Sequence, residues 1–336
     1  MARMKLDEAV DDVIAQAMAA DERIVVIGED VHMLRPGLYT QFGASRVLPA
    51  PISEAAFVGA AVGAAMAGLR PVVEVMMVDF IAVAMDSVLN HMAKVEGFSG
   101  GTWTCPLVVR AACGAGYGDG GQHGQSLWGM LAGIPGLSVV VPSTPADAAG
   151  LMRTAIEHDG PVFFMEPKLL TEGWLEFLGR GGREMLEFDV PKAGAEGVVP
   201  DPLPAVPLGQ AVVRRTGRDL TILSLAVGVH RALEACAELT ASGISCEVID
   251  LRSVRPLDTA CVVQSVRKTG RMLVVDEDYT HFGLSGELAA TALEAGLRPA
   301  YGRVGVDDTL PFARDREAQA LPNVERIVAA AKALCG

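Results

Sequence analysis

The sequence predicts an α/β fold with two domains, each built on a mainly parallel sheet that is covered by helices. Short apolar runs of the kind found in buried strands alternate with helical patterns along most of the chain, and such alternation is typical of parallel sheets. At 336 residues, half of them hydrophobic, the chain can also bury two cores. Between residues 180 and 207 the periodicity is lost and prolines accumulate, which indicates a linker.

The predicted elements follow this scheme in chain order. In the first part we expect strands at residues 24–27, 72–75, 107–109, 138–141 and 162–165. In the second part we expect strands at 220–225, 246–249 and 272–275, and helices at about 230–242 and 324–334. The predicted domains are therefore residues 1–185 and 208–336, joined by a Pro/Gly-rich linker at 186–207.

Composition excludes several classes of partner. The 28 basic and 41 acidic residues give a net charge of -13 without a basic cluster, which argues against binding to nucleic acid. The longest uncharged helical stretch, residues 55–69, is too short to cross a membrane. Six scattered cysteines form no CxxC pair, as expected in a reducing compartment, and no secretory signal is recognisable. We therefore expect a cytoplasmic protein.

Residues 50–69 place a single carboxylate, Glu54, at the start of a helix that otherwise holds glycine, alanine and apolar residues. Ser53 is the expected N-cap, and Gly59, Gly63 and Ala67 share one face on which another backbone can approach closely. The pattern favours a buried helix. An ordinary acid in a first helical turn, stabilised by the helix dipole, is the alternative interpretation of Glu54.

Residues 114–124 carry six glycines, five of them before His123, which lies near the end of the loop. A histidine on such a loop is better placed to meet a ligand than one on an apolar helix. From residue types alone, a solvated loop and a functional site are equally good interpretations.

These segments belong to a set of landmarks that resembles one enzyme family along nearly the whole chain. The landmarks are residues 28–31, 51–71, 79–80, 99–101, 122–125, 135–137, 166–170 and 248–252. In this order they resemble the β subunit of the decarboxylating component of 2-oxo acid dehydrogenase complexes, which depends on thiamine diphosphate and includes pyruvate, acetoin and branched-chain types. The resemblance implies a pyrimidine-binding parallel-sheet domain followed by a domain like the carboxyl-terminal domain of transketolases.

The resemblance also implies roles for four residues. Glu54 would hydrogen-bond a ring nitrogen of the cofactor's aminopyrimidine, and an apolar pocket would help to keep its proton available. Phe80 would stack on the aminopyrimidine and Met76 would line the same pocket, although a core phenylalanine at a strand end is an equally good interpretation of Phe80. His123 would contact the substrate and help to transfer the acyl group to a lipoyl group.

Magnesium is not expected on this chain. In thiamine enzymes, a Gly-Asp-Gly motif such as residues 118–120 is followed some thirty residues later by an asparagine that helps to hold magnesium and the diphosphate. The only asparagines here, Asn90 and Asn323, are not at that spacing. The resemblance then implies an α subunit that holds Mg²⁺, two α and two β chains, and a lipoyl-bearing acyltransferase or carrier protein as a further partner.

The resemblance further implies a structural potassium ion held by backbone carbonyls. The matching positions are Leu107, Ala155, His158 and Gly160, and the last two differ from the Asp and Asn often found there. Backbone ligation tolerates such changes.

Two departures from the family pattern leave the reaction open. Glu96 and Gly97 stand where a basic residue and a tyrosine are common, a change that would enlarge the pocket or alter the contact with the α subunit. Pyruvate and acetoin are the expected small keto substrates. Transfer of a two-carbon ketol unit to a biosynthetic carrier is the first alternative. A non-catalytic scaffold is the second, and the joint presence of Glu54, Phe80 and His123 argues against it.

In the second part of the chain, Asp276, Glu277 and Asp278 stand close to His281. We expect these residues to form a solvated loop between a strand and a helix. A metal site is the less favoured alternative, because no further ligands follow at a useful spacing.

Overall fold

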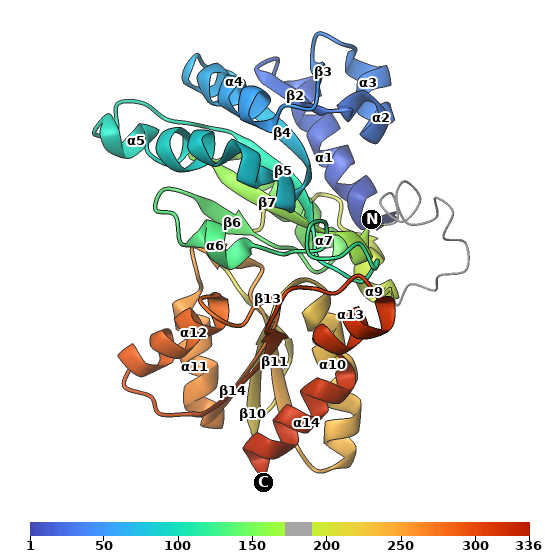
Figure 1. Ribbon diagram of the computed structural model, residues 1–336, viewed down its shortest axis with the longest axis vertical. Coiled ribbons are helices and arrows are strands. Elements are labelled where there is room, and N and C mark those ends of the chain that lie inside the picture. Colours follow the sequence, from blue (N-terminus) through green and yellow to red (C-terminus); the bar gives the residue numbers. More distant parts are fainter. Residues whose placement is uncertain (172–189) are drawn as a thin grey trace.

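The computed structural model describes residues 1–171 and 190–336. It contains two α/β units, one above the other in Figure 1, with the carboxyl terminus at the far end of the second unit. The predicted boundary between residues 185 and 186 lies outside the described residues. Each unit has a sheet in the middle and helices on both faces, so the predicted α/β fold is confirmed.

The first sheet has seven strands in the order β12-β6-β7-β5-β4-β2-β3. Six of them come from the first part of the chain: β2 (Ile24–Glu29), β3 (Val47–Ala50), β4 (Arg70–Met77), β5 (Val108–Cys113), β6 (Ser138–Val140) and β7 (Val162–Pro167). These six strands run parallel to one another. A separate antiparallel pair joins β1 (Ala2–Lys5) to β8 (Glu196–Val199), and β8 lies within the proposed linker.

Helices cover both faces of this sheet. On one face, α1 (Leu6–Ala20) and α7 (Pro145–Glu157) pack against the strands. On the other face lie α4 (Glu54–Met66), the 3-10 helix η1 (Val78–Ala84), the π-helix η2 (Ser87–Met92) and α6 (Trp128–Ala132). The remaining short helices are α2 (Val31–Leu34), α3 (Pro36–Phe42), α5 (Val95–Phe98), η3 (Lys168–Leu170) and α9 (Lys192–Ala195).

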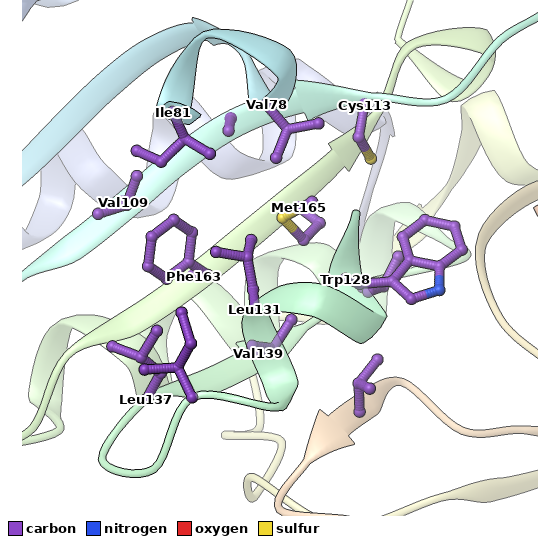
Figure 2. Packing of buried hydrophobic residues seen from close by; sticks show 14 of the residues in the cluster. Val78, Ile81, Val109, Cys113, Trp128, Leu131, Leu137, Val139, Phe163 and Met165 are labelled. Atoms are coloured by element: carbon purple, nitrogen blue, oxygen red, sulfur yellow. The ribbon is translucent and has the colours of Figure 1, made fainter. Parts of the chain in front are cut away.

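The apolar runs form strands because both faces of this sheet are covered. All six residues of β5 and all six of β7 are buried, so these strands need no polar alternation. Figure 2 shows Phe163 and Met165 of β7 in one cluster with Ile81 of η1 and with Trp128 and Leu131 of α6. This packing fixes the sheet against the segments that follow β4 and β5.

The second sheet has five strands in the order β14-β13-β10-β11-β9. They are β9 (Val212–Arg215), β10 (Leu220–Ser224), β11 (Cys246–Asp250), β13 (Arg271–Tyr279) and β14 (Ala300–Val306), and only β9 is antiparallel to its neighbour. The helices α10 (Ala226–Ala241) and α14 (Val324–Cys335) cover one face, and α11 (Thr259–Thr269) and α12 (Leu284–Glu294) cover the other. Helix α13 (Arg314–Ala320) follows β14.

The two units are joined by more than the linker. Strand β12 (Ser253–Arg255) belongs to the second part of the chain but pairs with β6 at the edge of the first sheet. One hydrophobic cluster runs from α4 and β5 to β10 and α11 without interruption. Arg252 also donates to Asp147 of α7 across the junction at 2.8 Å. The units therefore share a core.

The prediction of a solvated acidic loop is wrong. Asp276, Glu277 and Asp278 lie inside β13, and each is at most 7% exposed. The indole nitrogen of Trp128 donates to Asp276 at 3.0 Å, and the backbone NH of Gly129 donates to Asp278 at 2.8 Å. Donors from a distant part of the chain thus allow these acidic side chains to be buried. His281, in contrast, is exposed as expected.

Burial of this acidic triplet predicts a dependence of stability on pH. The pKa of Asp276 is raised above its ordinary value of 3.8, first by burial and then by the charge of Asp278, and the pKa of Glu277 is raised by burial to about 7. The folded chain therefore keeps protons that the unfolded chain releases, so stability is lost as the pH rises from about 4 to about 8, the pKa of Asp276 in the folded chain. Each retained proton contributes a slope of about 1.4 kcal/mol per pH unit.

We expect Asp276→Asn to reduce the slope of stability against pH, because asparagine has no proton to release. Urea unfolding of the chain between pH 5 and pH 7.5 measures the slope for the parent and for the variant. The exposed Glu22→Gln serves as the control and should leave the slope unchanged. Parallel curves for the parent and for Asp276→Asn would contradict a protonated Asp276.

Helix α4 is only partly buried, contrary to the prediction of a buried helix. Phe57, Val58 and Ala61 pack into the core, but the opposite face is exposed and consists of alanine, glycine and methionine: Ala55, Ala56, Ala60, Gly63 and Met66. Phe98 and Trp103 lie nearby and are 81% and 57% exposed. A hollow of about 450 Å³ runs between these residues and α4. We call this surface the α4 face; its apolar character suits burial against another chain.

A network of buried charges ties the strands of the first sheet to α1. Arg110 of β5 is fully buried; its Nε donates to Glu166 of β7 and its Nη1 donates to Asp11 of α1, both at 2.5 Å. Arg35 pairs with Glu74 of β4 at 2.7 Å and lies 3.6 Å from Glu166. Burial of this kind is tolerated only while every charge keeps its partner.

Within the described ranges, no helix is both long enough and apolar enough to span a bilayer.

Candidate functional site

The candidate residues gather at one edge of the first sheet. Strands β7, β5, β4 and β2 are consecutive in the sheet and run parallel, so their carboxyl ends meet at this edge. Glu29 ends β2, Phe80 follows β4, the glycine-rich loop 114–124 follows β5, and Lys168 follows β7. Ligands of open parallel sheets commonly bind at this edge.

Glu54 occupies the first position of α4, after β3, at the same edge. Ser53 is at the N-cap position as predicted, but its hydroxyl donates to the carbonyl of Pro51 instead of capping the helix. Glu54 is 7% exposed, and its carboxylate makes no hydrogen bond or ion pair within the part of the chain that the structure describes. Glu29 feels its charge: the pKa of Glu29 is raised by burial and then by the charge of Glu54. A buried carboxyl group without a protein partner is suited to hydrogen-bonding a ligand.

Phe80 and His123 meet directly. Their ring centroids are 5.5 Å apart and the ring planes are nearly perpendicular, at 85°. Both rings are partly exposed, and Met76 packs beside Phe80 against Met77 and Ala112. Phe80, Met76 and His123 therefore line one site, and Glu54 lies farther along the same edge without a hydrogen bond to them.

The loop that carries His123 is more ordered than its composition suggests. Gly114, Gly116, Gly118 and Gly120 all have φ between 71° and 111°, which side-chain-bearing residues rarely adopt. The backbone NH of Gly114 donates to the carbonyl of Gln125 at 3.0 Å and closes the loop at its base. Glycine at these positions is thus explained by the course of the backbone.

Sequence reasoning missed the residues that hold this loop. The side chain of Gln125 donates to Asp79 at 2.8 Å, and the hydroxyl of Tyr279 in β13 donates to Gln125 at 2.9 Å. The backbone NH of Gly118 donates to Glu317 of α13 at 2.9 Å. The second unit therefore supports the loop directly. Asp79 and Gln125 stood inside landmark motifs, but nothing in the sequence marked Tyr279 or Glu317.

The four residues proposed for potassium lie at the opposite edge of the sheet. Leu107 precedes β5, Gly160 precedes β7, and Ala155 and His158 lie at the carboxyl end of α7. The carbonyl of His158 accepts from Arg70 Nη2 at 2.7 Å, and the carbonyl of Leu107 accepts from the backbone NH of Val162 at 3.0 Å. This group is separate from His123.

The two departures from the family pattern also lie away from His123. Glu96 and Gly97 are exposed residues of α5 and line a hollow of about 680 Å³, together with residues at the amino ends of β5, β6 and β7. Their position indicates a change at a surface and not in the pocket at the carboxyl edge.

Among the described residues, no group of three or more His, Cys, Asp or Glu side chains is arranged to hold a metal ion.

Two family descriptions match the chain and together cover most of it. Residues 2–172 match "Transketolase, pyrimidine binding domain" and residues 209–327 match "Transketolase, C-terminal domain". A solved structure entitled "Split gene transketolase, inactive beta4 tetramer" superposes with a TM-score of 0.79 over 99% of this chain and 98% of that one. At 22% identity this likeness shows the fold.

Named relatives identify a narrower family than the two domain descriptions do. The chain is 39% identical to the pyruvate dehydrogenase E1 component subunit beta of Rhizobium meliloti (strain 1021), over the whole of this chain and 70% of the relative. It is 36% identical to the acetoin:2,6-dichlorophenolindophenol oxidoreductase subunit beta of Bacillus subtilis (strain 168), over the whole of this chain and 98% of the relative. The chain therefore belongs to the family of β subunits of thiamine-diphosphate-dependent 2-oxo acid dehydrogenases.

Proposed function

We propose that this chain contributes half of an active site in which a small keto substrate is decarboxylated or cleaved and its acyl unit is passed to a lipoyl group. The observation that carries the proposal is the buried, unpartnered carboxyl group of Glu54 on the same sheet edge as the Phe80–His123 pair. Pyruvate and acetoin are the substrates we favour, because they are named in the titles of the relatives.

Thiamine diphosphate, when bound, supplies the electron sink for breaking the bond next to the keto group. Glu54 would hold a proton against a ring nitrogen of the aminopyrimidine and thereby select its tautomer. Phe80 and Met76 would hold the same ring by apolar contact. His123 would donate a proton or stabilise developing charge on the substrate oxygen during acyl transfer. The partial exposure of Phe80 and His123 leaves room for these contacts.

We further propose that an α subunit completes the site, holds Mg²⁺ and the diphosphate, and covers the α4 face. A helix that is apolar on its exposed side as well as its buried side needs a partner surface. Two α and two β chains, with a lipoyl-bearing protein as acceptor, complete the proposed assembly. All six cysteines are free thiols, which supports work in a reducing compartment such as the cytoplasm.

Calorimetric titration of thiamine diphosphate with Mg²⁺ tests the shared site. We expect tight binding to the chain purified with its α partner and no measurable binding to the chain alone. Binding by the lone chain would overturn the division of the site between two subunits. Assay of the pair with pyruvate, with acetoin and with ketose phosphates then separates acyl transfer from two-carbon ketol transfer. A pair that binds the cofactor but converts none of them would support a scaffold.

We also propose a potassium ion at the carbonyls of Leu107, Ala155, His158 and Gly160. The carboxyl end of α7 supports it because free carbonyls and the helix dipole favour cations there. Arg70 already donates to one of these oxygens, whose second lone pair is left for the ion.

We expect 100 mM KCl to raise the melting temperature by roughly 1–3 °C over choline chloride, with NaCl raising it less. Equal melting temperatures in the three salts would exclude the site.

A further inference from the structure

Lys168 is a buried cation that the proposed reaction does not use. It is 1% exposed, and its pKa is lowered by burial. Its ammonium group donates to the backbone carbonyl of His123 and lies 5.1 Å from the ring centroid of Tyr117. The carbonyl of Lys168 accepts from the Tyr117 hydroxyl at 3.1 Å. Lys168 thus contacts the loop 114–124 near its middle and near its end.

Space filling alone does not explain a lysine at this position. A methionine of similar length would fill the volume without the cost of removing an ammonium group from water. The charges that face Lys168 come from several elements: Asp79 of η1, Asp119 of the loop, Cys113 of β5 and Glu317 of α13. The charges of these groups offset part of the cost of burying the ammonium group, but the direct hydrogen bond of Lys168 goes to the carbonyl of His123.

We propose that Lys168 is a positioning residue that acts through His123, by holding the backbone of the loop so that the imidazole stays against Phe80. The register of the sheet makes this contact accessible, because Cys113 at the end of β5 pairs with Pro167 at the end of β7. The loop leaves β5 and Lys168 leaves β7 at the same edge. This inference rests on the proposed role of His123 in the reaction.

The first test needs neither cofactor nor activity. Hydrogen–deuterium exchange of the free chain is followed in peptides that cover residues 114–125. Loss of a charged hydrogen bond should raise exchange there by about tenfold to a hundredfold in Lys168→Met, and Lys168→Arg should keep most of the protection. Peptides from β10 and β11 serve as the internal control. Unchanged exchange in residues 114–125 would overturn the inference.

The second test is a double-mutant cycle in the complex with the α subunit. Lys168→Met should lower kcat by about tenfold or more with the KM of the keto substrate changed by less than about threefold, and Lys168→Arg should recover part of the loss. In the background of His123→Ala, Lys168→Met should add almost nothing. Additive losses would mean that Lys168 acts independently of His123 and would refute the proposal.

The two proposals fail in distinguishable ways. If the parent complex converts no keto substrate, the proposed function fails, while the exchange experiment still decides whether Lys168 holds the loop. If the parent is active and the cycle is additive, only the inference about Lys168 fails. Should Lys168→Met not fold, Lys168→Gln, which keeps a donor without the charge, takes its place in both experiments.

Discussion

Replacement of Glu54 by glutamine is expected to lower kcat of the complex with the α subunit by about 10²- to 10⁴-fold. Glutamine keeps the size of the side chain and a hydrogen-bond donor, but it has no proton to exchange with a ring nitrogen. Because the carboxyl group is buried and has no partner within the described residues, its loss removes no internal contact. Binding of thiamine diphosphate, measured by calorimetry, should therefore weaken far less than kcat falls.

Glu287→Gln is a matched control for this experiment. Glu287 is likewise an acid in a first helical turn, that of α12, but it is exposed and lies in the second unit. Its replacement should leave kcat unchanged. If Glu54→Gln behaves in the same way as Glu287→Gln, Glu54 is an ordinary first-turn acid and the proposed mechanism fails.

Arg110→Met is expected to destabilise the chain by about 3–5 kcal/mol. Arg110 is fully buried and neutralises the buried Glu166 and the half-buried Asp11. Its removal leaves Arg35 as the one cation that the described residues place near both carboxylates. The energy lost is mainly the cost of the charges left unpaired and not the strength of the pair. Urea denaturation followed by circular dichroism measures the change.

Two further variants test whether the loss of stability comes from the burial of the charges. Lys332→Met breaks an exposed pair with Glu238, which is 2.9 Å long, and should cost well under 1 kcal/mol. The double variant Arg110→Met/Glu166→Gln should recover part of the lost stability, because it removes one of the orphaned charges. Equal losses from Arg110→Met and Lys332→Met would show that this network does not depend on its burial.

Much of the architecture could be predicted because buried strands of a parallel sheet are continuous apolar runs. Strands β2, β4, β5, β6 and β7 all lie where these runs were found. Glu54 and His123 stood out for a different reason: each is a polar residue in a setting of glycine, alanine or apolar residues. The spatial pairing of His123 with Phe80 follows from the sheet order, which local patterns do not contain.

The errors arose where a distant segment changes the surroundings of a residue. The acidic triplet of β13 suggested a solvated loop because its donors, Trp128 and Gly129, are about 150 residues earlier in the chain. Lys168 received no role because its contact with His123 exists only through the pairing of β5 with β7. The apolar sequence of α4 suggested a buried helix, but one face of this helix is exposed in the single chain.

Strand β12 has a consequence for any attempt to divide the protein. Because this strand from the second unit pairs with β6, an excised first unit would expose the backbone of β6, a short strand whose two valines are fully buried in the whole chain. Open apolar edges of this kind pair with other chains and aggregate. A fragment cut at the linker would thus be recovered in inclusion bodies more readily than in solution.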